Sequence, residues 1–381
     1  MILKLIQRAA RVISKSSRDQ PADAVLRAEL KAVPSLARRD AGAVSRAVFA
    51  YFRWRRWLAE KDPLERQIEQ AIFLATRFRE SPGSFSDAEL TAKSVPEWVS
   101  EQIEISPAWA RLLQADPKIW LRARPGREGE LVGSLSQAQA GPISCAVLYE
   151  GREDLFRMPE FHAGEFELQD IASQAIGHLC AAQPGQRWWD VCAGEGGKML
   201  HLADLMQNKG LIWASDRAQW RLKRLRLRAA RAKVFNFRTA VWDGGPKRPT
   251  KTEFNGVLLD APCSGIGTWQ RNPHARWTTT LADVHELAQL QLRLLAHAAS
   301  SVKRGGRLVY SVCTLTRAET RDVAEAFEKQ FPEFEPCPVP DPFAPTSPAQ
   351  SRHWLWPQGT GGGGMFASIW LRKSDAGSQG V

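Results

Sequence analysis

A repeating order of apolar strands, loops and helices after Gln169 constrains this chain more than any other feature. The runs RWWDV, LIWASD, NGVLLD and GRLVYSV are typical of buried strands, and helical patterns separate them, including a long one from Leu281 to Val302. Such alternation requires right-handed crossovers, so it predicts a mainly parallel sheet covered by helices. The expected fold class is α/β. Ligands of such sheets bind beyond the carboxyl ends of the strands, and candidate site residues are expected there.

Two further segments precede this domain. Residues 1–85 show a helical pattern rich in Ala, Leu and Arg, with prolines at the expected stops, which predicts a helical bundle. Residues 95–167 combine short helices with three strand-like runs and a possible helix from Glu128 to Gln139, which predicts a small α+β module. We therefore expect domains at 1–85, 95–167 and 168–373, followed by a disordered tail at 374–381.

Charge and cysteine content narrow the possible partners. The 381 residues carry 52 Lys and Arg against 41 Asp and Glu, and this formal net charge of +11 favours a polyanion such as nucleic acid. Six cysteines lie far apart without a paired or His-containing cluster, so we expect no metal site, no disulfide framework and a reducing, cytoplasmic location. No apolar run approaches the length of a membrane span. The basic first twenty residues could form a transit peptide, but the helical pattern that continues past them favours the bundle.

A glycine-rich turn in WWDVCAGEGGKML joins the first strand of the α/β domain to its helix. It matches neither the dinucleotide nor the phosphate-loop pattern, and an ordinary tight turn would also explain it. Asp216 closes the next strand nineteen positions after Gly197, near the spacing at which an acid binds ribose hydroxyls, and Asp243 follows a third strand. Either aspartate alone could be a helix cap, but the three strand ends together predict a nucleoside pocket without a pyrophosphate, which suits S-adenosylmethionine.

Cys263 and Cys313 stand at the ends of two other predicted strands, in DAPCSGIGTWQRNPHARW and YSVCTLTRAE. C5 of a pyrimidine is a poor nucleophile, but a thiolate that adds to C6 makes C5 able to attack a methyl donor. One cysteine is needed as nucleophile, and a second group can assist the later elimination. Two strand-end cysteines beside a methyl-donor pocket match this need, whereas the alternative is that they are only small apolar side chains.

The motifs occur along the chain in the order LQDIASQ, DVCAGEGGK, Asp216, Asp243 and the two cysteine motifs. With this combination the chain resembles the RsmB/Nop/Sun family of RNA cytosine C5-methyltransferases. The resemblance extends from about Pro96 to Leu371. The resemblance implies a Rossmann-like class I methyltransferase domain. DNA cytosine methyltransferases attack with the cysteine of the Pro-Cys motif alone, so the presence of both cysteines points to RNA.

The resemblance also implies roles for individual residues. Cys313 is the expected nucleophile, Cys263 assists product release, Asp260 holds the target base and Lys198 lies near the active centre. The implied cofactor-binding residues are Cys192, Ala193, Gly194, Glu195, Gly196, Gly197, Lys198, Asp216, Arg221, Asp243 and Asp260.

The chain departs from the family's pattern near both motifs. The family usually has Cys-Ala-Ala-Pro-Gly-Gly-Lys-Thr where this chain has Cys-Ala-Gly-Glu-Gly-Gly-Lys-Met, so Glu195 puts a negative charge close to the expected sulfonium. A threonine usually precedes the nucleophile, and here that residue is Val312. We expect catalysis to survive this change, because Val has the same β-branched backbone preference.

Several segments are candidates for contact with RNA. Eight basic residues lie between Arg217 and Val234, but an apolar stripe at Leu222, Leu225 and Ala229 favours an ordinary solvated helix. Arg271 and Arg276 have a better claim, because they directly follow the first cysteine motif. The segment 95–167 resembles the family's RNA-recognition-like module, and 1–85 resembles, more faintly, its NusB-like helical domain in abbreviated form.

We therefore predict a monomeric, cytoplasmic, S-adenosylmethionine-dependent RNA cytosine C5-methyltransferase without a metal, acting on ribosomal RNA by family analogy. Transfer RNA is an alternative substrate. A second alternative is transfer of the methyl group to C5 of a uracil or to an amino group of RNA. The cysteine motifs speak against the amino group, because that reaction needs no thiol. A third is an RNA-binding ribosome-assembly protein of the same fold that is catalytically weak or inactive.

Overall fold

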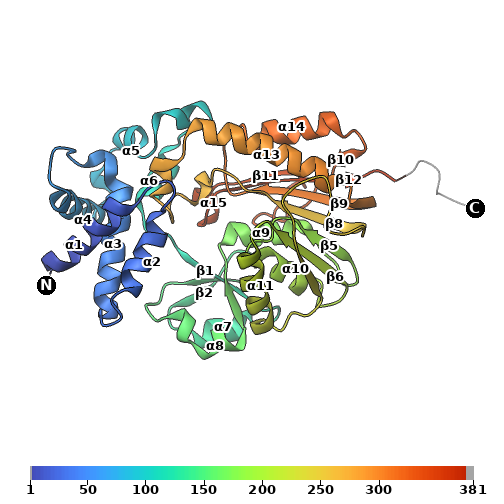
Figure 1. Ribbon diagram of the computed structural model, residues 1–381, viewed down its shortest axis with the longest axis horizontal. Coiled ribbons are helices and arrows are strands. Elements are labelled where there is room, and N and C mark those ends of the chain that lie inside the picture. Colours follow the sequence, from blue (N-terminus) through green and yellow to red (C-terminus); the bar gives the residue numbers. More distant parts are fainter. Residues whose placement is uncertain (1, 375–381) are drawn as a thin grey trace, which may run out of the picture. The chain divides into compact units, whose positions relative to one another are not determined.

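The computed structural model describes residues 2–374, so the tail expected to be disordered lies outside the described residues except for its first residue, Ser374 (Figure 1). The chain divides into two compact units. Unit 1 consists of Met1–Pro117 with Ser264–Val284, and unit 2 consists of Lys118–Cys263 with His285–Val381. The chain therefore leaves unit 2 directly after Cys263 and returns to it at His285. The predicted domain boundaries at 85, 95 and 168 stay predictions.

Unit 1 is helical throughout its described residues. Pro21 and Pro63 each directly precede a helix. Prolines are expected at such breaks, because a proline cannot continue the helix that comes before it. Its apolar stripes pack together around Val12, Val48 and Phe52. The helices are α1 Ile2–Lys15, α2 Ala22–Lys31, α3 Arg38–Trp54, α4 Leu64–Glu80, α5 Asp87–Lys93, α6 Pro107–Gln114 and α12 Ala275–Thr278, with 3-10 turns η1 Arg55–Trp57, η2 Pro82–Ser84, η3 Glu97–Glu101 and η5 Ile266–Thr268. The long helix α13 (Leu281–Ala299) begins in unit 1 and continues into unit 2.

Unit 2 contains a small antiparallel sheet and a large mixed sheet. The small sheet has the order β2-β3-β1-β4. Its elements are β1 Ile119–Ala123, α7 Glu128–Ser134, β2 Ala138–Ala140, β3 Ala146–Tyr149, η4 Leu155–Arg157, α8 Pro159–Ala163 and β4 Phe166–Leu168. The helix predicted to reach Gln139 is therefore too long. It ends at Ser134 because Leu135 is extended and Gln137 has a positive φ of 57°, which turns the chain into β2.

The large sheet has the order β10-β12-β9-β8-β5-β6-β7, with β11 on β12. Strands β9, β8, β5, β6 and β7 are parallel to their neighbours, and β12 joins β9 antiparallel. The strands are β5 Arg187–Asp190, β6 Leu211–Asp216, β7 Phe237–Val241, β8 Phe254–Asp260, β9 Val302–Val312, β10 Phe334–Pro336, β11 Arg352–Leu355 and β12 Met365–Arg372. Strands β6 and β7 lie on one side of β5, whereas β8 and β9 lie on its other side. The strand order therefore reverses between β5 and β8, and ligands of such sheets bind at this position.

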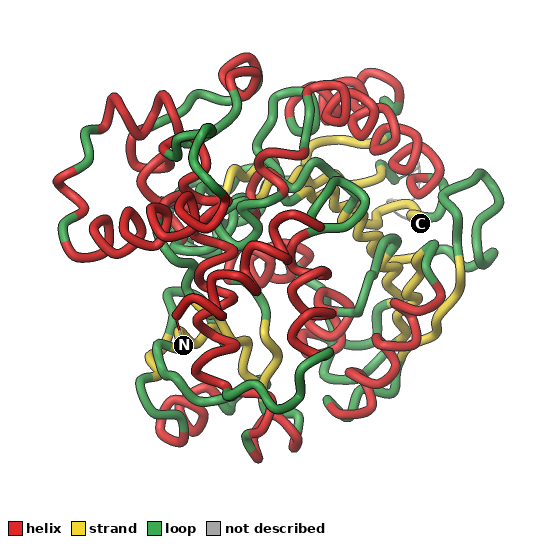
Figure 2. Tube along the Cα trace, turned by 60° about the vertical axis from the view of Figure 1, so that its left-hand side comes forward, coloured by secondary structure: helices red, strands yellow, loops and turns green. Residues whose placement is uncertain are grey.

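Helices cover both faces of the large sheet, as predicted (Figure 1). On one face α9 (Ile171–Cys180), α10 (Gly197–Leu205) and α11 (Gln219–Arg231) form one apolar core with the strands, while α13 and α14 (Arg321–Gln330) form a second core on the other face. Figure 2 shows these helices beside the strands in a second view. The helix predicted to reach Val302 ends at Ala299, and Val302 instead opens β9 by pairing with Phe254.

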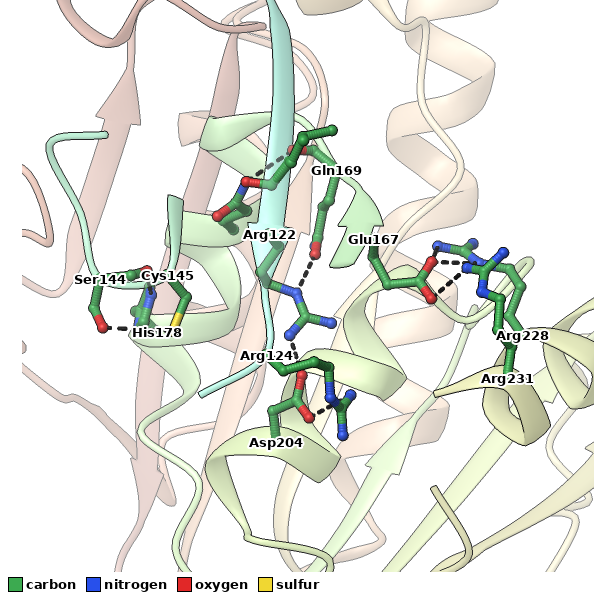
Figure 3. A network of polar contacts seen from close by, with 12 residues as sticks. Arg122, Arg124, Ser144, Cys145, Glu167, Gln169, His178, Asp204, Arg228 and Arg231 are labelled. Carbon is green, nitrogen blue, oxygen red and sulfur yellow. Dashed lines mark hydrogen bonds and ion pairs between the residues drawn. The ribbon is translucent and has the colours of Figure 1, made fainter. Parts of the chain in front are cut away.

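Buried ion pairs attach the small sheet to the α/β part of unit 2 (Figure 3). Arg122 on β1 bonds to Asp204 on α10, and Glu167 on β4 accepts from Arg228 at 2.8 Å and from Arg231 on α11. Arg122 and Glu167 are only 1% and 2% exposed. Removing one partner of such a pair leaves a buried charge, which typically costs about 3–5 kcal/mol of stability. The small sheet is therefore held in one position against α10 and α11.

The remaining described helix is the short α15 (Pro357–Thr360). Among residues 2–374, none of the helices combines the length and the apolar character that crossing a bilayer requires.

Candidate functional site

The turn between β5 and α10 is an open cradle made by three glycines. Gly194 and Gly196 have positive φ angles of 54° and 90°, which side chains rarely adopt. A Cβ on Gly196 would lie 2.7 Å from Cγ of Leu225, whereas a Cβ on Gly194 or Gly197 would meet open space. The glycines therefore allow the turn to pack against α11 on one side and leave room for a ligand on the other.

Asp216 at the end of β6 holds this turn in place. The residue is 5% exposed, and its carboxylate accepts from the Gly194 amide at 3.1 Å and from the Ala218 amide at 2.8 Å. Arg221 lies 3.7 Å from the same carboxylate. Asp243 lies two residues past β7, is exposed, and accepts from the Gly245 amide at 2.8 Å within its own loop. The structure thus joins Asp216 and Arg221 to the turn, and the cofactor roles of these residues stay predictions.

The other residues of the turn differ in what they offer a ligand. Ala193 is nearly buried, and its amide donates to the Ser215 carbonyl at 2.8 Å. Burial raises the pKa of the Cys192 thiol far above its usual value, so this cysteine is neutral and acts as a small apolar side chain. Glu195 points toward α11, where its carboxylate pairs with Arg224 at 2.9 Å. The charge that departs from the family's pattern is therefore partly neutralised by a neighbouring cation.

The two thiols of the cysteine motifs lie side by side. Asp260 at the end of β8 is paired in register with Ser311 on β9, so the loops that follow the two strands leave the sheet together. Sγ of Cys263 is 3.2 Å from Sγ of Cys313, and both residues are half-buried. Val312 before Cys313 is fully buried and is the last residue of β9, so its β-branched side chain occupies a strand position. That catalysis survives this departure from the family's pattern stays a prediction.

An ion pair between a buried lysine and a half-buried aspartate lies beside the thiols. Nζ of Lys198, on the first turn of α10, donates to Asp260 at 2.6 Å, and the Ser311 hydroxyl donates to the other oxygen of the same carboxylate at 2.8 Å. Burial alone would lower the pKa of Lys198, but the negative charges of Asp260 and Cys313 outweigh it and raise that pKa. Lys198 is therefore a fixed cation, and a nearby cation favours the reactive thiolate form of Cys313. Ser311 is part of this group because of strand register, which no local sequence signal reveals.

Asp190, the last residue of β5, is a second acid at this site that the sequence did not indicate. It is fully buried, and neither carboxylate oxygen has a normal hydrogen-bond partner among the described residues. Burial first, and then the charges of Asp260 and Asp216, raise the pKa of Asp190 to about 8, against the opposing effect of Lys198. The backbone N–H of Met199 approaches the carboxyl group and lowers its pKa, which is the smallest of these effects. Asp190 is therefore mostly protonated at neutral pH.

A buried hydrogen-bond network fixes the two cysteine loops to each other. The Gln291 amide on α13 donates to the Pro262 carbonyl at 2.9 Å and to the Glu319 carboxylate at 3.0 Å. The oxygen of the Tyr310 hydroxyl lies 2.9 Å from the Gln291 amide oxygen and 2.6 Å from the Glu319 carbonyl, and its one proton can be donated to either acceptor. Because Pro262 precedes one cysteine and Glu319 follows the other, the network holds the thiols in register. The sequence analysis missed these residues, since they come together only in the folded sheet.

Burial corrects one of the two predictions of RNA contact. Arg276 is fully buried in unit 1, where its guanidinium donates to the Ser94 carbonyl at 2.9 Å and to the Leu113 carbonyl at 2.8 Å. Burial and the nearby Arg53 lower its pKa to about 9. Arg276 is thus a structural residue of unit 1 and is not available to RNA. Arg271 lies exposed, and its contact with RNA stays a prediction.

The described part of the chain holds no group of three or more His, Cys, Asp or Glu side chains placed to share a metal ion. The site consists instead of an open glycine turn, two adjacent thiols and a lysine–aspartate pair.

Comparison with known proteins agrees with this geometry. The profile of the family described as 16S rRNA methyltransferase RsmB/F matches residues 178–371. A relative named probable ribosomal RNA small subunit methyltransferase B, from Synechocystis, is 33% identical over 276 residues, which cover 67% of this chain and 60% of the relative. A protein of the same name from Bacillus subtilis is 35% identical over 65% of this chain and 58% of its own length. The chain thus spans about 60% of the length of the curated relatives it matches.

Solved structures support the same assignment. The structure of PH0851 covers 96% of this chain with a TM-score of 0.78 and 23% identity, which shows the fold. A methyltransferase homolog protein from Pyrococcus horikoshii covers 70% of this chain with a TM-score of 0.58 and 25% identity over 90% of its own length. NSun6 from Pyrococcus horikoshii, solved with SFG, covers 59% of this chain and 57% of its own, with a TM-score of 0.51 and 25% identity. The large sheet is therefore that of a Rossmann-like methyltransferase, and the chain belongs to the RsmB/Nop/Sun family, within which it matches the RsmB/F profile.

Proposed function

We propose that this chain transfers the methyl group of S-adenosylmethionine to C5 of a cytosine in RNA. The observation that carries the proposal is the pair of thiols 3.2 Å apart, beside the ion pair of Lys198 and Asp260 at the ends of β8 and β9. Thiol addition to C6 is the chemistry by which a pyrimidine C5 becomes nucleophilic. Membership of the RsmB/Nop/Sun family supports the same reaction.

The glycine turn fits S-adenosylmethionine. Gly194 and Gly197 border open space, and Asp216 stands at the end of the neighbouring strand, where ribose hydroxyls are bound in folds of this kind. The structure of the relative NSun6 was solved with SFG, an analogue of S-adenosylmethionine. When bound, S-adenosylmethionine supplies an electrophilic methyl group on a positively charged sulfur, and S-adenosylhomocysteine remains after its transfer.

The two cysteines divide the covalent work between them. The Cys313 thiolate forms a bond to C6 of the cytosine, and the electron pair of the C5–C6 double bond becomes available at C5 to take up the methyl group. A base then removes the C5 proton, the electron pair of that C–H bond restores the double bond, and the thiolate of Cys313 leaves. Cys263, in contact with Cys313, assists this last elimination. The balance is one cytosine methylated and one proton released.

Asp260 provides a means of distinguishing cytosine from uracil. Its two oxygens already accept one hydrogen bond each, from Lys198 and Ser311, and a carboxylate has about four acceptor positions. The remaining positions can accept from the amino group of cytosine. Uracil presents a carbonyl oxygen at the same edge, which the carboxylate would repel.

Ribosomal RNA is the proposed substrate, because the curated relatives are named as ribosomal RNA small subunit methyltransferases. Transfer RNA is the alternative. Mapping 5-methylcytosine in the total RNA of a strain that lacks the protein identifies the substrate, since the missing mark names both the molecule and the position.

The test of the mechanism separates the two thiols. Cys313→Ser should abolish methyl transfer and any covalent RNA complex, because a serine hydroxyl is scarcely ionised and adds poorly to C6. Cys263→Ala should accumulate methylated RNA bound through Cys313, visible as slow-migrating protein on a denaturing gel. Cys145→Ala, which removes a half-buried thiol of the small sheet, is the matched control and should turn over normally.

Two results would contradict the proposal. An adduct in the Cys313→Ser variant that is absent from Cys263→Ala would reverse the two roles. Normal turnover in both variants, or calorimetry that detects no S-adenosylmethionine binding with or without RNA, would favour the RNA-binding assembly protein instead.

A further inference from the structure

One segment of the chain is strongly basic and contains no acidic residue. Between Arg217 and Trp242 there are nine Lys and Arg residues and no Asp or Glu, whereas the whole chain has a formal net charge of +11. The segment comprises helix α11 and strand β7 at one edge of the large sheet. An excess of one sign on a single helix and strand creates a local field that attracts a polyanion.

Four of the nine cations of this segment lie beside carboxylates. Arg221 lies 3.7 Å from Asp216, Arg224 pairs with Glu195, and Arg228 and Arg231 pair with Glu167 beside the small sheet (Figure 3). The other five, here called the outer cations, are exposed, and within residues 2–374 they form no ion pair with a carboxylate. They are Arg217, Lys223, Arg226, Lys233 and Arg238. We call these five residues, together with the exposed apolar side chains described next, the α11 surface.

Large apolar side chains lie exposed among these cations. Trp220 is 54% exposed, Leu227 73% and Phe235 76%. The guanidinium carbons of Arg221 and Arg224 each lie 5.4 Å from the centre of the Trp220 ring. Exposed aromatic rings next to cations are the kind of surface on which unpaired bases stack.

The surface continues into a cleft of about 340 Å³ between α11 and the small sheet. Leu227 and Arg228 line one side of the cleft, and Phe156 and Phe161 line the other. Phe156 is 58% exposed, while Arg231 stacks on Phe161 at 3.7 Å. Aromatic rings and cations thus extend from the outer face of α11 to the small sheet.

We propose that the α11 surface binds an unpaired stretch of the RNA that contains the target cytosine, with bases stacked on Trp220 and phosphates near the outer cations. This inference rests on the proposed function, because it assigns a place to the same substrate. Leu222, Leu225 and Ala229 are buried, as the sequence predicted for an amphipathic helix. The sequence analysis favoured an ordinary helix whose outer side is solvated. That interpretation does not explain why the large apolar side chains of Trp220 and Leu227 are exposed there. RNA fits better than an acidic protein, since RNA supplies both phosphates for the cations and flat bases for the ring.

The test measures binding of a short, fluorescein-labelled single-stranded RNA by anisotropy over a series of salt concentrations. Trp220→Ala should weaken binding by about 5- to 150-fold, the usual effect of losing one base–aromatic stack. The triple change Lys223→Ala, Arg226→Ala and Arg238→Ala should make the slope of log affinity against log salt shallower by about 2, because each lost phosphate contact removes about 0.7. Trp354→Ala, which removes a 40% exposed tryptophan on β11 at the other end of the sheet, is the matched control and should bind as the unmodified chain does.

Different outcomes separate this inference from the proposed function. If the unmodified chain binds S-adenosylmethionine and RNA but Trp220→Ala and the triple variant bind RNA equally well, the α11 surface is wrong and the proposed function stands. An equal loss of affinity for single-stranded RNA and for a duplex of the same sequence would overturn the assignment to unpaired RNA. If the unmodified chain binds neither ligand, both proposals fail. Calorimetry with S-adenosylmethionine alone checks that each variant remains folded.

Discussion

Replacing Asp190 with asparagine should change how the stability of unit 2 depends on pH. Asp190 is fully buried without a normal hydrogen-bond partner among the described residues, and its pKa is raised from the ordinary 3.8 to about 8. The native state therefore holds this proton up to about pH 8, while the unfolded state releases it near pH 4. Between these values the native state binds more protons than the unfolded state, so stability falls as pH rises.

The size of the effect follows from the difference between the two pKa values. Each pH unit between about 4 and 8 removes about 1.4 kcal/mol from the free energy of unfolding, which amounts to about 4 kcal/mol at pH 7. The amide side chain of the variant stays neutral at every pH, so the variant does not lose this part of its free energy of unfolding as pH rises. The stability of Asp190→Asn relative to the unmodified chain should therefore grow by about 1.4 kcal/mol per pH unit across this range and level off above pH 8.

Urea denaturation followed by circular dichroism at pH 4, 5, 6, 7 and 8 measures this difference. At pH 4 both side chains are neutral in the native state, so that point reports any change in packing and is the internal control. Parallel curves for the two proteins between pH 4 and pH 8 would show that the buried carboxylate finds a compensating partner, and the reasoning would be refuted.

Three further predictions concern other parts of the structure. Hydrogen peroxide should oxidise Cys263 and Cys313 to a disulfide, with loss of two electrons and two protons, because their sulfurs lie 3.2 Å apart, and dithiothreitol should reduce it again. Mass spectrometry that finds both thiols still open to alkylation after peroxide treatment would contradict this. Arg276→Met should lower the free energy of unfolding of unit 1 by about 2–4 kcal/mol, since two buried carbonyls lose their donor, and an unchanged urea midpoint would be evidence against that role. Gly196→Ala should weaken S-adenosylmethionine binding in calorimetry, because the new Cβ would meet Leu225 at 2.7 Å in a left-handed turn; equal affinity would show that the turn can adjust.

The strand ends could be predicted from sequence because periodicity and turn residues are local signals. Asp216, Asp260, Cys263 and Cys313 occupy the ends of strands, or the residues just after them, as the pattern of apolar runs indicated. Their arrangement into neighbours depends on strand order and register. The contact of the two thiols follows from the adjacency of β8 and β9, which no stretch of sequence encodes by itself.

Burial of charged residues was the main feature that could not be predicted. Arg276 follows the first cysteine motif, so its sequence position suggests an exposed role, yet it is enclosed by the carbonyls of α6 and of the segment before η3. The burial of Asp190 was also not apparent, because an acid at a strand end usually faces solvent or a ligand. The carbonyls that enclose Arg276 lie 182 and 163 residues away along the chain, and Asp260, whose charge has the largest effect of any on Asp190, comes from the neighbouring strand β8.

The passage of the chain into unit 1 directly after Cys263 limits how this protein can be shortened or recombined. Residues 264–284 fold with residues 1–117, and Arg276, Trp277 and Asp283 each bond to partners there. A fragment that begins at Lys118 would keep these twenty-one residues but lose the partners of Arg276, Trp277 and Asp283 in residues 1–117, and residue 264 directly follows one of the thiols. Such a fragment would therefore lack part of one of the two compact units. Exchanging the N-terminal region between relatives would require moving two separate stretches of sequence together, and substitutions in one stretch constrain those tolerated in the other.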